Sequence, residues 1–343
     1  MSGDRAEGCR VVTLTANPSL DRTLALPGPL ARGEVARLGP SSTEPGGKGV
    51  NVARALAAAG ADVLAVVPAD PTDPLVAALE ALRLPLVTVP TGAPVRTNYS
   101  LTEPDGTTTK LNEPGTALDA GLRAALAAAV TAAAVGARWV VLSGSLPPGT
   151  PEDWYADLVR AVRGTGARVA VDTSEAPLRA LLAAGPDAAP DLLKPNAEEL
   201  AQVTGTGEAD LLADPAALTA AVAQLHARGV GEVLLTLGGD GAVLSTAAGE
   251  VWSARAPRIA VRSTVGAGDS SLAGHLLADL AGAPVSERLR RAVATGSAAA
   301  ALPGSAVPTP RQVDPSAVTV SPGPPGSPPS TPEPVPAASR DVH

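Results

Sequence analysis

Short segments rich in valine and leucine alternate with amphipathic segments along most of this chain of 343 residues. The strand-like segments share a length of five to seven residues and a dominance of aliphatic side chains: RVVTLT (10–15), ADVLAVV (61–67), PLVTV (85–89), RWVVLSG (138–144), ARVAVDT (167–173) and EVLLTLG (232–238). The helix-like segments between many of them are 49–59, 119–135, 152–163 and 215–228. Apolar strands that alternate with helices are typical of a parallel sheet covered on both faces. The pattern therefore predicts an α/β protein with a mostly parallel sheet flanked by helices.

Two segments, 22–45 and 95–113, interrupt this alternation. The second contains VRTNYSLTEPDGTTTKLN (95–112), in which apolar and polar residues alternate around a Pro-Asp-Gly sequence. Such alternation is typical of a strand with one covered face, and Pro-Asp-Gly favours a tight turn. We expect both segments to form small antiparallel pieces outside the main sheet.

Composition excludes several classes of protein. The chain is 45% hydrophobic and 17% charged, which predicts a globular protein with an ample core, built mainly from Ala, Val and Leu because Phe is absent. A net charge of −8 argues against a nucleic-acid-binding surface. The single cysteine, Cys9, excludes an intramolecular disulfide framework, and three scattered histidines argue against a zinc site.

The sequence predicts neither a secretory signal nor a membrane span. The first ten residues are polar and of mixed charge, and the most apolar region (124–142) is rich in alanine and interrupted by Gly136 and Arg138. We therefore expect a cytoplasmic protein without a membrane partner. The last segment, 321–343, holds eight prolines and no apolar period, which predicts a disordered tail.

The segment PGGKGVNVARALAAAG (45–60) places a glycine cluster directly before a helix. Glycine lets backbone approach a ligand closely, and Lys48 and Asn51 would project near that approach. A flexible loop before a helix explains the same residues. The segment is not a Walker A loop, because Ser42 stands where the first glycine is needed and Gly49 where a hydroxyl would hold magnesium.

The segment LLKPNAEEL (192–200) also has two interpretations. Asn196 and Glu199 have the spacing of a capping box, which accounts for them locally. Alternatively, Glu199 holds Mg²⁺ through water while Lys194 and Asn196 face phosphates at the end of a strand. The local pattern favours neither interpretation.

Two further strand ends are candidates for ligand contact. TLGGDGAVL (236–244) has the composition of a hairpin turn, and its bare backbone would equally suit a nucleotide phosphate. LSGSLPPG (142–149) ends a strand in a rigid loop, and ligands of open α/β sheets bind at the carboxyl ends of strands. Ser143 is therefore a candidate contact, although an ordinary loop start explains it as well.

The segment STVGAGDSSLAG (263–274) carries the strongest chemical signal. The backbone amides of Gly266, Ala267 and Gly268 at the start of a helix would form an anion site. Asp269 could cap the helix, or it could accept a hydroxyl proton beside a bound phosphate. We expect the helix dipole to keep Asp269 ionised.

Taken in order, these motifs resemble the signatures of the PfkB carbohydrate kinases of the ribokinase-like superfamily. The resemblance covers about residues 10–318 and includes TANPSLDRTL with GEVAR, PGGKGVNVARALAAAG, SGSLPPGTPEDWYADLV, LKPNAEEL and STVGAGDSSLAG. NPSLD and GGKG together are similar to the hexose-phosphate branch, which includes 1-phosphofructokinase and tagatose-6-phosphate kinase. The resemblance implies a doubly wound, mostly parallel sheet flanked by helices, with a small β lid at 22–45 and 95–113.

The resemblance also implies ATP-dependent phosphorylation of a sugar hydroxyl with Mg²⁺, and a role for each motif residue. The residues that would hold the sugar phosphate are Asp21, Gly46, Gly47, Lys48, Asn51, Arg96 and Ser143. The residues that would hold the nucleotide are Lys194, Asn196, Thr236, Gly238, Gly239, Gly241 and Gly268. Asp269 would be the catalytic base, with Gly266, Ala267 and Gly268 at the phosphoryl group, and Glu199 would hold the metal.

The substrate that the resemblance favours is fructose 1-phosphate, converted to fructose 1,6-bisphosphate. Tagatose 6-phosphate and fructose 6-phosphate are alternatives, because the motifs do not define where the existing phosphate sits. A catalytically silent sugar-phosphate sensor is a further alternative, although a sensor needs neither Asp269 nor Glu199. Lid strands often pair between subunits in this superfamily, so a homodimer is a further expectation.

Overall fold

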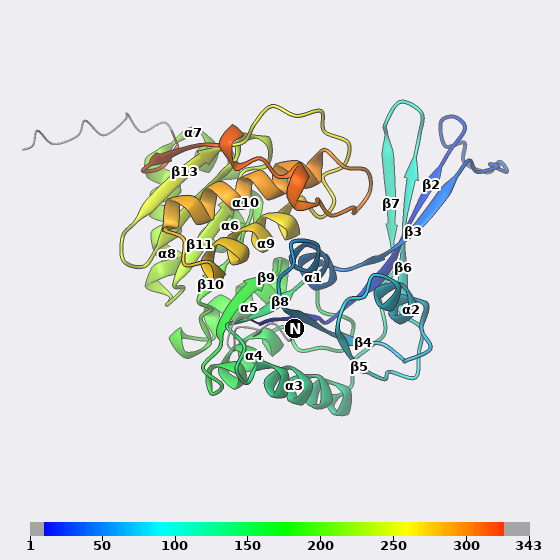
Figure 1. Cartoon of the computed structure of the whole chain (residues 1–343), viewed down its shortest axis with the longest axis horizontal. Coiled ribbons are helices and arrows are strands. Elements are labelled where there is room, and N and C mark those ends of the chain that lie inside the picture. The colour runs from blue at the N-terminus through cyan, green and yellow to red at the C-terminus, as the bar shows by residue number, and fades with distance from the viewer. Residues whose placement is uncertain (1–9, 326–343) are drawn as a thin grey trace, which may run out of the picture.

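The computed structural model describes residues 10–325 and contains one large sheet of ten strands (Figure 1). In spatial order the strands are β14 (Thr319–Pro322), β13 (Val251–Arg255), β12 (Ala242–Thr246), β11 (Glu232–Thr236), β10 (Leu192–Leu193), β9 (Arg168–Asp172), β8 (Trp139–Ser143), β1 (Val11–Thr15), β4 (Val63–Pro68) and β5 (Leu86–Val89). The strands from β11 to β5 run parallel. This confirms the predicted mostly parallel α/β fold.

The chain winds outward from β1 in both directions. It first adds β4 and β5 on one side and then β8, β9, β10 and β11 on the other. The direction of winding therefore reverses between β1 and β8, and open sheets of this kind bind ligands beyond the carboxyl ends of the strands at such a point.

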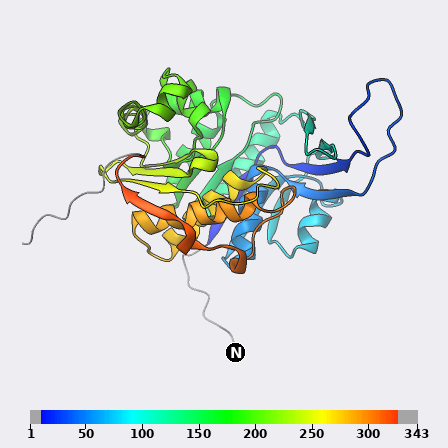
Figure 2. The same cartoon turned by 90° about the horizontal axis from the view of Figure 1, so that it is seen from above.

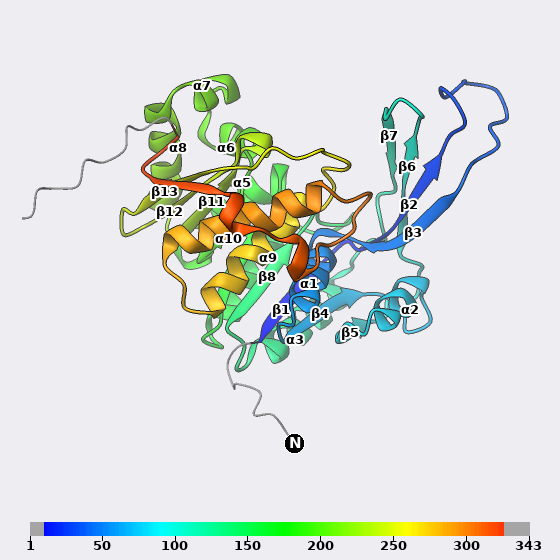
Figure 3. The same ribbon diagram turned by 45° about the horizontal axis from the view of Figure 1, so that its top comes forward.

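Helices cover both faces of the sheet. They are α1 (Lys48–Ala58), α2 (Pro74–Ala81), α3 (Ala120–Ala134), α4 (Trp154–Arg163), α5 (Glu175–Ala183), α6 (Ala197–Thr204), α7 (Glu208–Ala213), α8 (Pro215–Ala227), α9 (Ala267–Leu280) and α10 (Val285–Ala300). Figure 3 shows α9 and α10 side by side next to α1, on the face opposite to α3.

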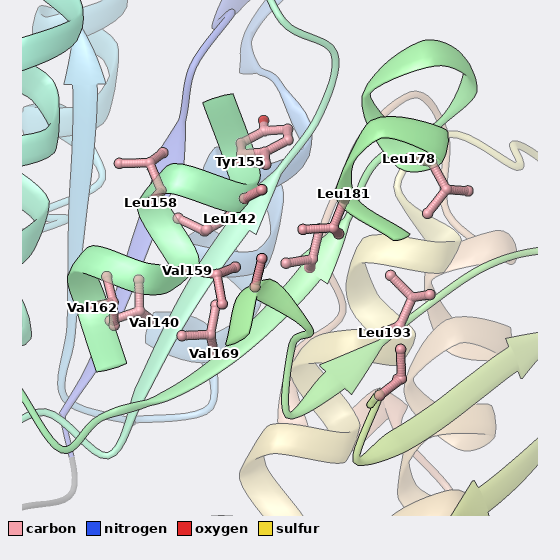
Figure 4. Packing of buried hydrophobic residues seen from close by; sticks show 14 of the residues in the cluster. Val140, Leu142, Tyr155, Leu158, Val159, Val162, Val169, Leu178, Leu181 and Leu193 are labelled. Atoms are coloured by element: carbon pink, nitrogen blue, oxygen red, sulfur yellow. The ribbon is translucent and has the colours of Figure 1, made fainter. Parts of the chain in front are cut away.

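Each parallel strand contributes side chains to two hydrophobic cores, because successive side chains point to opposite faces of the sheet. In β8, Val140 and Leu142 join the core formed with α3, α4, α5, α6 and α8, while Trp139 and Val141 join the core formed with α1, α2, α9 and α10. Figure 4 shows part of the first core, in which Tyr155 and Val159 of α4 lie against β8 and β9. Burial on both faces explains why these strands are continuous apolar runs.

A second sheet of four strands extends from one end of the molecule (Figures 1 and 2). Its spatial order is β3 (Ser41–Gly46), β2 (Ser19–Ala25), β6 (Arg96–Thr102) and β7 (Thr108–Asn112). The predicted segments 22–45 and 95–113 each form an antiparallel pair outside the main sheet, as expected, and a parallel pairing of β2 with β6, which was not predicted, joins the two pairs. A hairpin is specified locally, whereas this central pairing joins strands that both leave the main body in the same direction.

The carboxyl-terminal part of the sheet also departs from the expectations. β12, β13 and β14 add an antiparallel edge. Ser321 and Pro322, which were expected to start the disordered tail, belong to β14, because an edge strand tolerates a proline without an N–H donor. Residues 326–343 of the predicted tail lie outside the described residues. Between residues 10 and 325, no helix has the length and apolar character that crossing a bilayer requires.

Candidate active site

A cleft of about 640 Å³ lies at the carboxyl ends of the strands and reaches the base of the small sheet. The main sheet contributes residues that directly follow or end β1, β8, β9, β10 and β11, which is where the winding reverses. The predicted site residues that line this cleft are Asp21, Gly47, Lys48, Asn51, Arg96, Lys194, Asn196, Glu199, Thr236, Gly238, Gly239, Gly241, Gly266, Ala267, Gly268 and Asp269. Motifs separated by more than 200 residues therefore meet in one cavity.

Two predicted residues do not line the cleft. Ser143 is fully buried, and the next residue, Gly144, lines the cleft instead. Gly46 lies against Asp21: a Cβ at residue 46 would stand 2.3 Å from the Asp21 carboxylate. Direct contact of Ser143 and Gly46 with a ligand stays a prediction, and in the fold Gly46 leaves room for Asp21.

The start of α9 has the geometry of an anion site. Gly266 is the N-cap, with a left-handed φ of 74° that favours glycine. Ser270 N donates to Gly266 O at 2.8 Å, and the N–H of Ala267 makes a long contact of 3.4 Å with Thr264 O. Among the described residues, the N–H groups of Gly268 and Asp269 have no acceptor. These free donors and the positive end of the helix dipole favour a bound anion.

Asp269 lies inside the first turn of α9 and caps nothing, so the N-cap interpretation is wrong. Its Oδ2 accepts a hydrogen bond from Asn51 Nδ2 at 2.9 Å, and 6% of the residue is exposed. Burial, and next the negative charge of Asp172, raises the pKa of Asp269 to about 6, although Lys48, Asn51 and Lys194 act in the opposite direction. At neutral pH the Asp269 carboxyl is therefore mostly ionised, as expected, but it takes up a proton near and below pH 6.

Asp172, at the end of β9, is a site residue that the sequence analysis missed. Its side chain is fully buried, and its two oxygens face two lysines: Oδ1 lies 2.8 Å from Lys48 Nζ and Oδ2 lies 3.1 Å from Lys194 Nζ. Burial alone would raise the pKa of Asp172, but the two ammonium groups outweigh it and lower this pKa. The available signal was a carboxylate at the end of a valine-rich strand, the same argument that led to Ser143.

The pKa of Lys48 shifts in the direction opposite to that of Asp172. Burial by itself lowers the pKa of Lys48, but the carboxylates of Asp172 and Asp269 outweigh it and raise that pKa above its ordinary value. The ammonium group is therefore charged at neutral pH.

The segment after β10 forms the capping box that one interpretation of its sequence predicted, and it also lies at the cleft. Asn196 Oδ1 accepts from Glu199 N at 2.7 Å and Glu199 Oε2 accepts from Asn196 N at 2.8 Å, which completes a capping box. Both residues also line the cleft. Within residues 10–325 no group of three or more His, Cys, Asp or Glu side chains is arranged to hold a metal. A cation at Glu199 would therefore need water or ligand oxygens as well.

The glycines between β11 and β12 serve different purposes. A Cβ at Gly241 would stand 1.9 Å from Ala254 O, so this glycine permits the approach of neighbouring backbone. Around Gly238 and Gly239 a Cβ would meet nothing within 4 Å. These two residues thus leave bare backbone open to the cleft. The lining of the cleft also includes the aliphatic residues Ile259, Val261, Val265 and Val293.

The base of the small sheet supplies a polar rim. Asp21 Oδ1 accepts from Ser19 Oγ at 2.8 Å and from Asn98 Nδ2 at 3.0 Å. Arg96 donates from Nη1 to Glu113 O and from Nη2 to Asn17 O. Asn17, Asn98 and Ser145 line the cleft and were not predicted individually, because isolated amides and hydroxyls have no distinctive spacing.

The fold and this cleft define a carbohydrate kinase of the ribokinase-like type. The sequence pattern described as pfkB family carbohydrate kinase matches residues 15–312. The chain therefore belongs to the pfkB family of carbohydrate kinases.

Several characterised relatives are phosphofructokinases. A 1-phosphofructokinase from Xanthomonas campestris pv. campestris is 39% identical over 268 residues, which are 77% of this chain and 82% of the relative. The ATP-dependent 6-phosphofructokinase isozyme 2 of Escherichia coli (strain K12) is 34% identical over 294 residues, 84% of this chain and 92% of the relative. The structure of phosphofructokinase-2 from Escherichia coli in complex with substrates and products has a TM-score of 0.81 and 31% identity, and the match covers 89% of this chain and 97% of that chain.

The buried charge of Asp269 predicts a variant that is more stable than the wild type. The pKa of Asp269 is about 6 in the folded chain, against an ordinary value of 3.8. As pH rises, the carboxyl of the unfolded chain therefore loses its proton before that of the folded chain. The free energy of unfolding decreases for this reason between about pH 4 and pH 6. Asp269→Asn removes this loss. We expect it to raise the free energy of unfolding by about 1–3 kcal/mol at pH 7.5 and by little at pH 4, measured by urea denaturation.

A matched control lies at the other end of α9. Asp279 Oδ1 accepts from Arg168 Nη1 at 3.0 Å and from Arg288 Nη1 at 3.2 Å. Asp279→Asn breaks these ion pairs and is expected to lower stability at pH 7.5. An equal loss of stability in Asp269→Asn would contradict the assigned environment of Asp269.

Proposed function

We propose that the chain transfers the γ-phosphoryl group of ATP to a hydroxyl of fructose 1-phosphate and forms fructose 1,6-bisphosphate. The observation that carries the proposal is the position of the Asp269 carboxylate. It lies in the first turn of α9 beside free backbone N–H groups, and it shares the cleft with the sugar-side and nucleotide-side motifs. A proton acceptor and an anion site in adjacent positions are what the transfer of a phosphoryl group to a hydroxyl requires.

Asp269 is better suited to accept the proton than the other buried carboxylates. The oxygens of Asp172 are each paired with a lysine, and the lowered pKa makes Asp172 a weak base. Glu199 uses Oε2 in a capping box. Asp269 has a neutral amide as its hydrogen-bond partner, and a pKa of about 6 combines ionisation at neutral pH with appreciable basicity.

The charges around the start of α9 suit the travelling phosphoryl group. In a loose transition state negative charge is spread over its equatorial oxygens, so catalysis depends mainly on positioning and charge stabilisation. The N–H groups of Gly268 and Asp269 supply donors, and Lys194 Nζ lies close to Gly268, where a Cβ would be 3.3 Å away. These groups would take the charge without rearranging.

The sugar phosphate fits the polar rim beside the small sheet. Arg96 supplies the positive charge for a phosphate that the sugar already carries, while Asp21, Lys48 and Asn51 supply hydrogen-bonding groups for hydroxyls. The relatives named 1-phosphofructokinase support fructose 1-phosphate as the substrate. The Escherichia coli isozyme named for fructose 6-phosphate makes that sugar the main alternative.

The nucleotide fits the other half of the cleft. Lys194 and Asn196 would face its phosphates, the open backbone at Gly238 and Gly239 would lie against the nucleotide, and the aliphatic residues of the same cleft would cover the adenine. Mg²⁺ would rest on Glu199 through water and on the phosphates, where it neutralises their charge. Unlike Asp172, Glu199 forms no direct ion pair with a lysine among the described residues.

Asp269→Asn is expected to lower kcat by about 10²–10⁴-fold while the sugar phosphate still binds, because the variant keeps the shape of the site and loses the proton acceptor. In the wild type, kcat at saturating substrate should fall about tenfold per pH unit below pH 6, as Asp269 becomes protonated. Coupled ADP-release assays measure both effects. Near-normal turnover in the variant would exclude Asp269 as the base.

Arg96→Ala is expected to raise the KM for a phosphorylated sugar by about 10–100-fold with a smaller effect on kcat, because a charged hydrogen-bond partner of the substrate phosphate is lost. The matched control is Arg22→Ala, which removes an arginine of the same sheet that lies over Tyr99, outside the cleft. The assay compares fructose 1-phosphate, fructose 6-phosphate, tagatose 6-phosphate and fructose. Preference for another sugar phosphate would correct the substrate, and ATP turnover with none of them would favour a silent sensor.

We also infer that two copies pair through the small sheet. β3 and β7 are its edge strands, and the segment between β2 and β3, which extends far from the main body in Figure 2, exposes Val35 and Leu38. A tetrameric form is known for phosphofructokinase-2 of Escherichia coli, which is similar in fold. Sedimentation should show a dimer that Val35→Asp weakens. A wild-type monomer at every concentration would contradict this.

A further inference from the structure

Asp172 joins two lysines that come from different parts of the chain. Lys48 begins α1, directly after the glycine cluster, and Lys194 follows β10. Each ammonium group faces one oxygen of the same carboxylate, at 2.8 Å and 3.1 Å. Asp172 is fully buried, and Lys194 is 5% exposed.

The two lysines stand at opposite ends of the proposed transfer. Lys48 lies one turn before Asn51 on α1, and Asn51 holds the Asp269 carboxylate at 2.9 Å. Lys194 lies against Gly268, at the anion site. Asp172 therefore touches one cation on the sugar side and one on the phosphoryl side, while it makes no bond to Asp269 itself.

Two free ammonium groups would not keep these positions unaided. A lysine side chain has several rotatable bonds, and fixing it costs about 1.5–2 kcal/mol of conformational entropy. Two like charges in a cleft of low dielectric also repel each other, whereas a carboxylate between them offsets the repulsion and orients both.

We propose that Asp172 is a positioning residue for phosphoryl transfer, which holds Lys48 beside the reacting hydroxyl and Lys194 beside the phosphoryl group. This inference rests on the proposed kinase function. Asp172 touches neither reactant; it acts through the two lysines.

The first experiment compares Asp172→Asn with the wild type. Asparagine has the shape of the aspartate side chain but no negative charge, so it holds the two lysines poorly. We expect kcat to fall at least about tenfold. The acid limb of kcat should also move to lower pH, because a negative charge near Asp269 has gone while Lys48, Lys194 and Asn51 still face it. A purely structural role would not move this limb.

Asp279→Asn is the matched control. It also removes a carboxylate that joins two cations, Arg168 and Arg288, on the same helix as Asp269 but at its far end. We expect it to lower stability while kcat stays within about threefold of the wild type and the acid limb keeps its position.

A double-mutant cycle tests whether Asp172 acts through the lysines. Asp172→Asn should reduce kcat by a smaller factor in a Lys48→Met background, because one of its two partners is already absent. The double variant also carries only one unpaired ammonium, so it replaces Asp172→Asn if the latter does not fold. Compared with Lys48→Met alone, its kcat should then be lower because Lys194 is released.

Several outcomes would overturn the proposal. The first two are a kcat of Asp172→Asn near that of the wild type and an acid limb of kcat that does not move in this variant. The third is an equal fold loss of kcat on adding Asp172→Asn to the wild type and to Lys48→Met. The fourth is recovery of the kcat of Asp172→Asn by added Mg²⁺, which would make Asp172 a metal ligand. Wild-type turnover with the sugar phosphates separates this failure from that of the kinase function. If the wild type shows no turnover, the proposed kinase function fails. If the wild type turns over a sugar phosphate, these outcomes contradict only the role of Asp172.

Discussion

Four carboxylates (Asp21, Asp172, Glu199 and Asp269) and two ammonium groups line the cleft, and the way they pair sets the chemistry available to each. Asp172 takes both lysines and stays ionised, whereas Asp269 has only the neutral amide of Asn51 as its hydrogen-bond partner and a raised pKa. Charges that are removed from water interact strongly, so the pairing of both lysines with Asp172 gives the two aspartates different pKa values. Asp172, with its lowered pKa, is therefore a weak base, whereas Asp269, with its raised pKa, is a stronger one.

The position of the anion site depends on how α9 is held. Gly274 and Gly296 let α9 and α10 approach closely, since a Cβ at either glycine would stand 2.5 Å or less from a side chain of the other helix. This close packing of α9 on α10 keeps the first-turn donors of α9 in a constant place, as preorganised catalysis requires.

Much of the main domain could be predicted from sequence. The six expected strands and four expected helices agree with observed elements to within a few residues. The glycine-rich motifs also converge, as their positions after apolar strands indicated. The parallel contact of β2 with β6 and the antiparallel edge from β12 to β14 were not predicted, because both depend on partners far away in sequence. Single side chains were harder to predict than motifs. Ser143 and Asp172 both end valine-rich strands, and nothing in their neighbours tells which one faces the cleft. The two residues are register partners on neighbouring parallel strands and share a face of the sheet, so only the folded chain shows that Lys48 and Lys194 converge on the Asp172 carboxylate.

The sequence by itself determined the strands, the helices and the glycine-rich turns, because each depends on residues only a few positions apart. Only the tertiary structure decided which charges meet. Lys48 and Asp172 are 124 residues apart, and Asn51 and Asp269 are 218 apart. Desolvation and Coulomb energies depend on distance in space and on burial, so the protonation of Asp269 is a property of the folded chain.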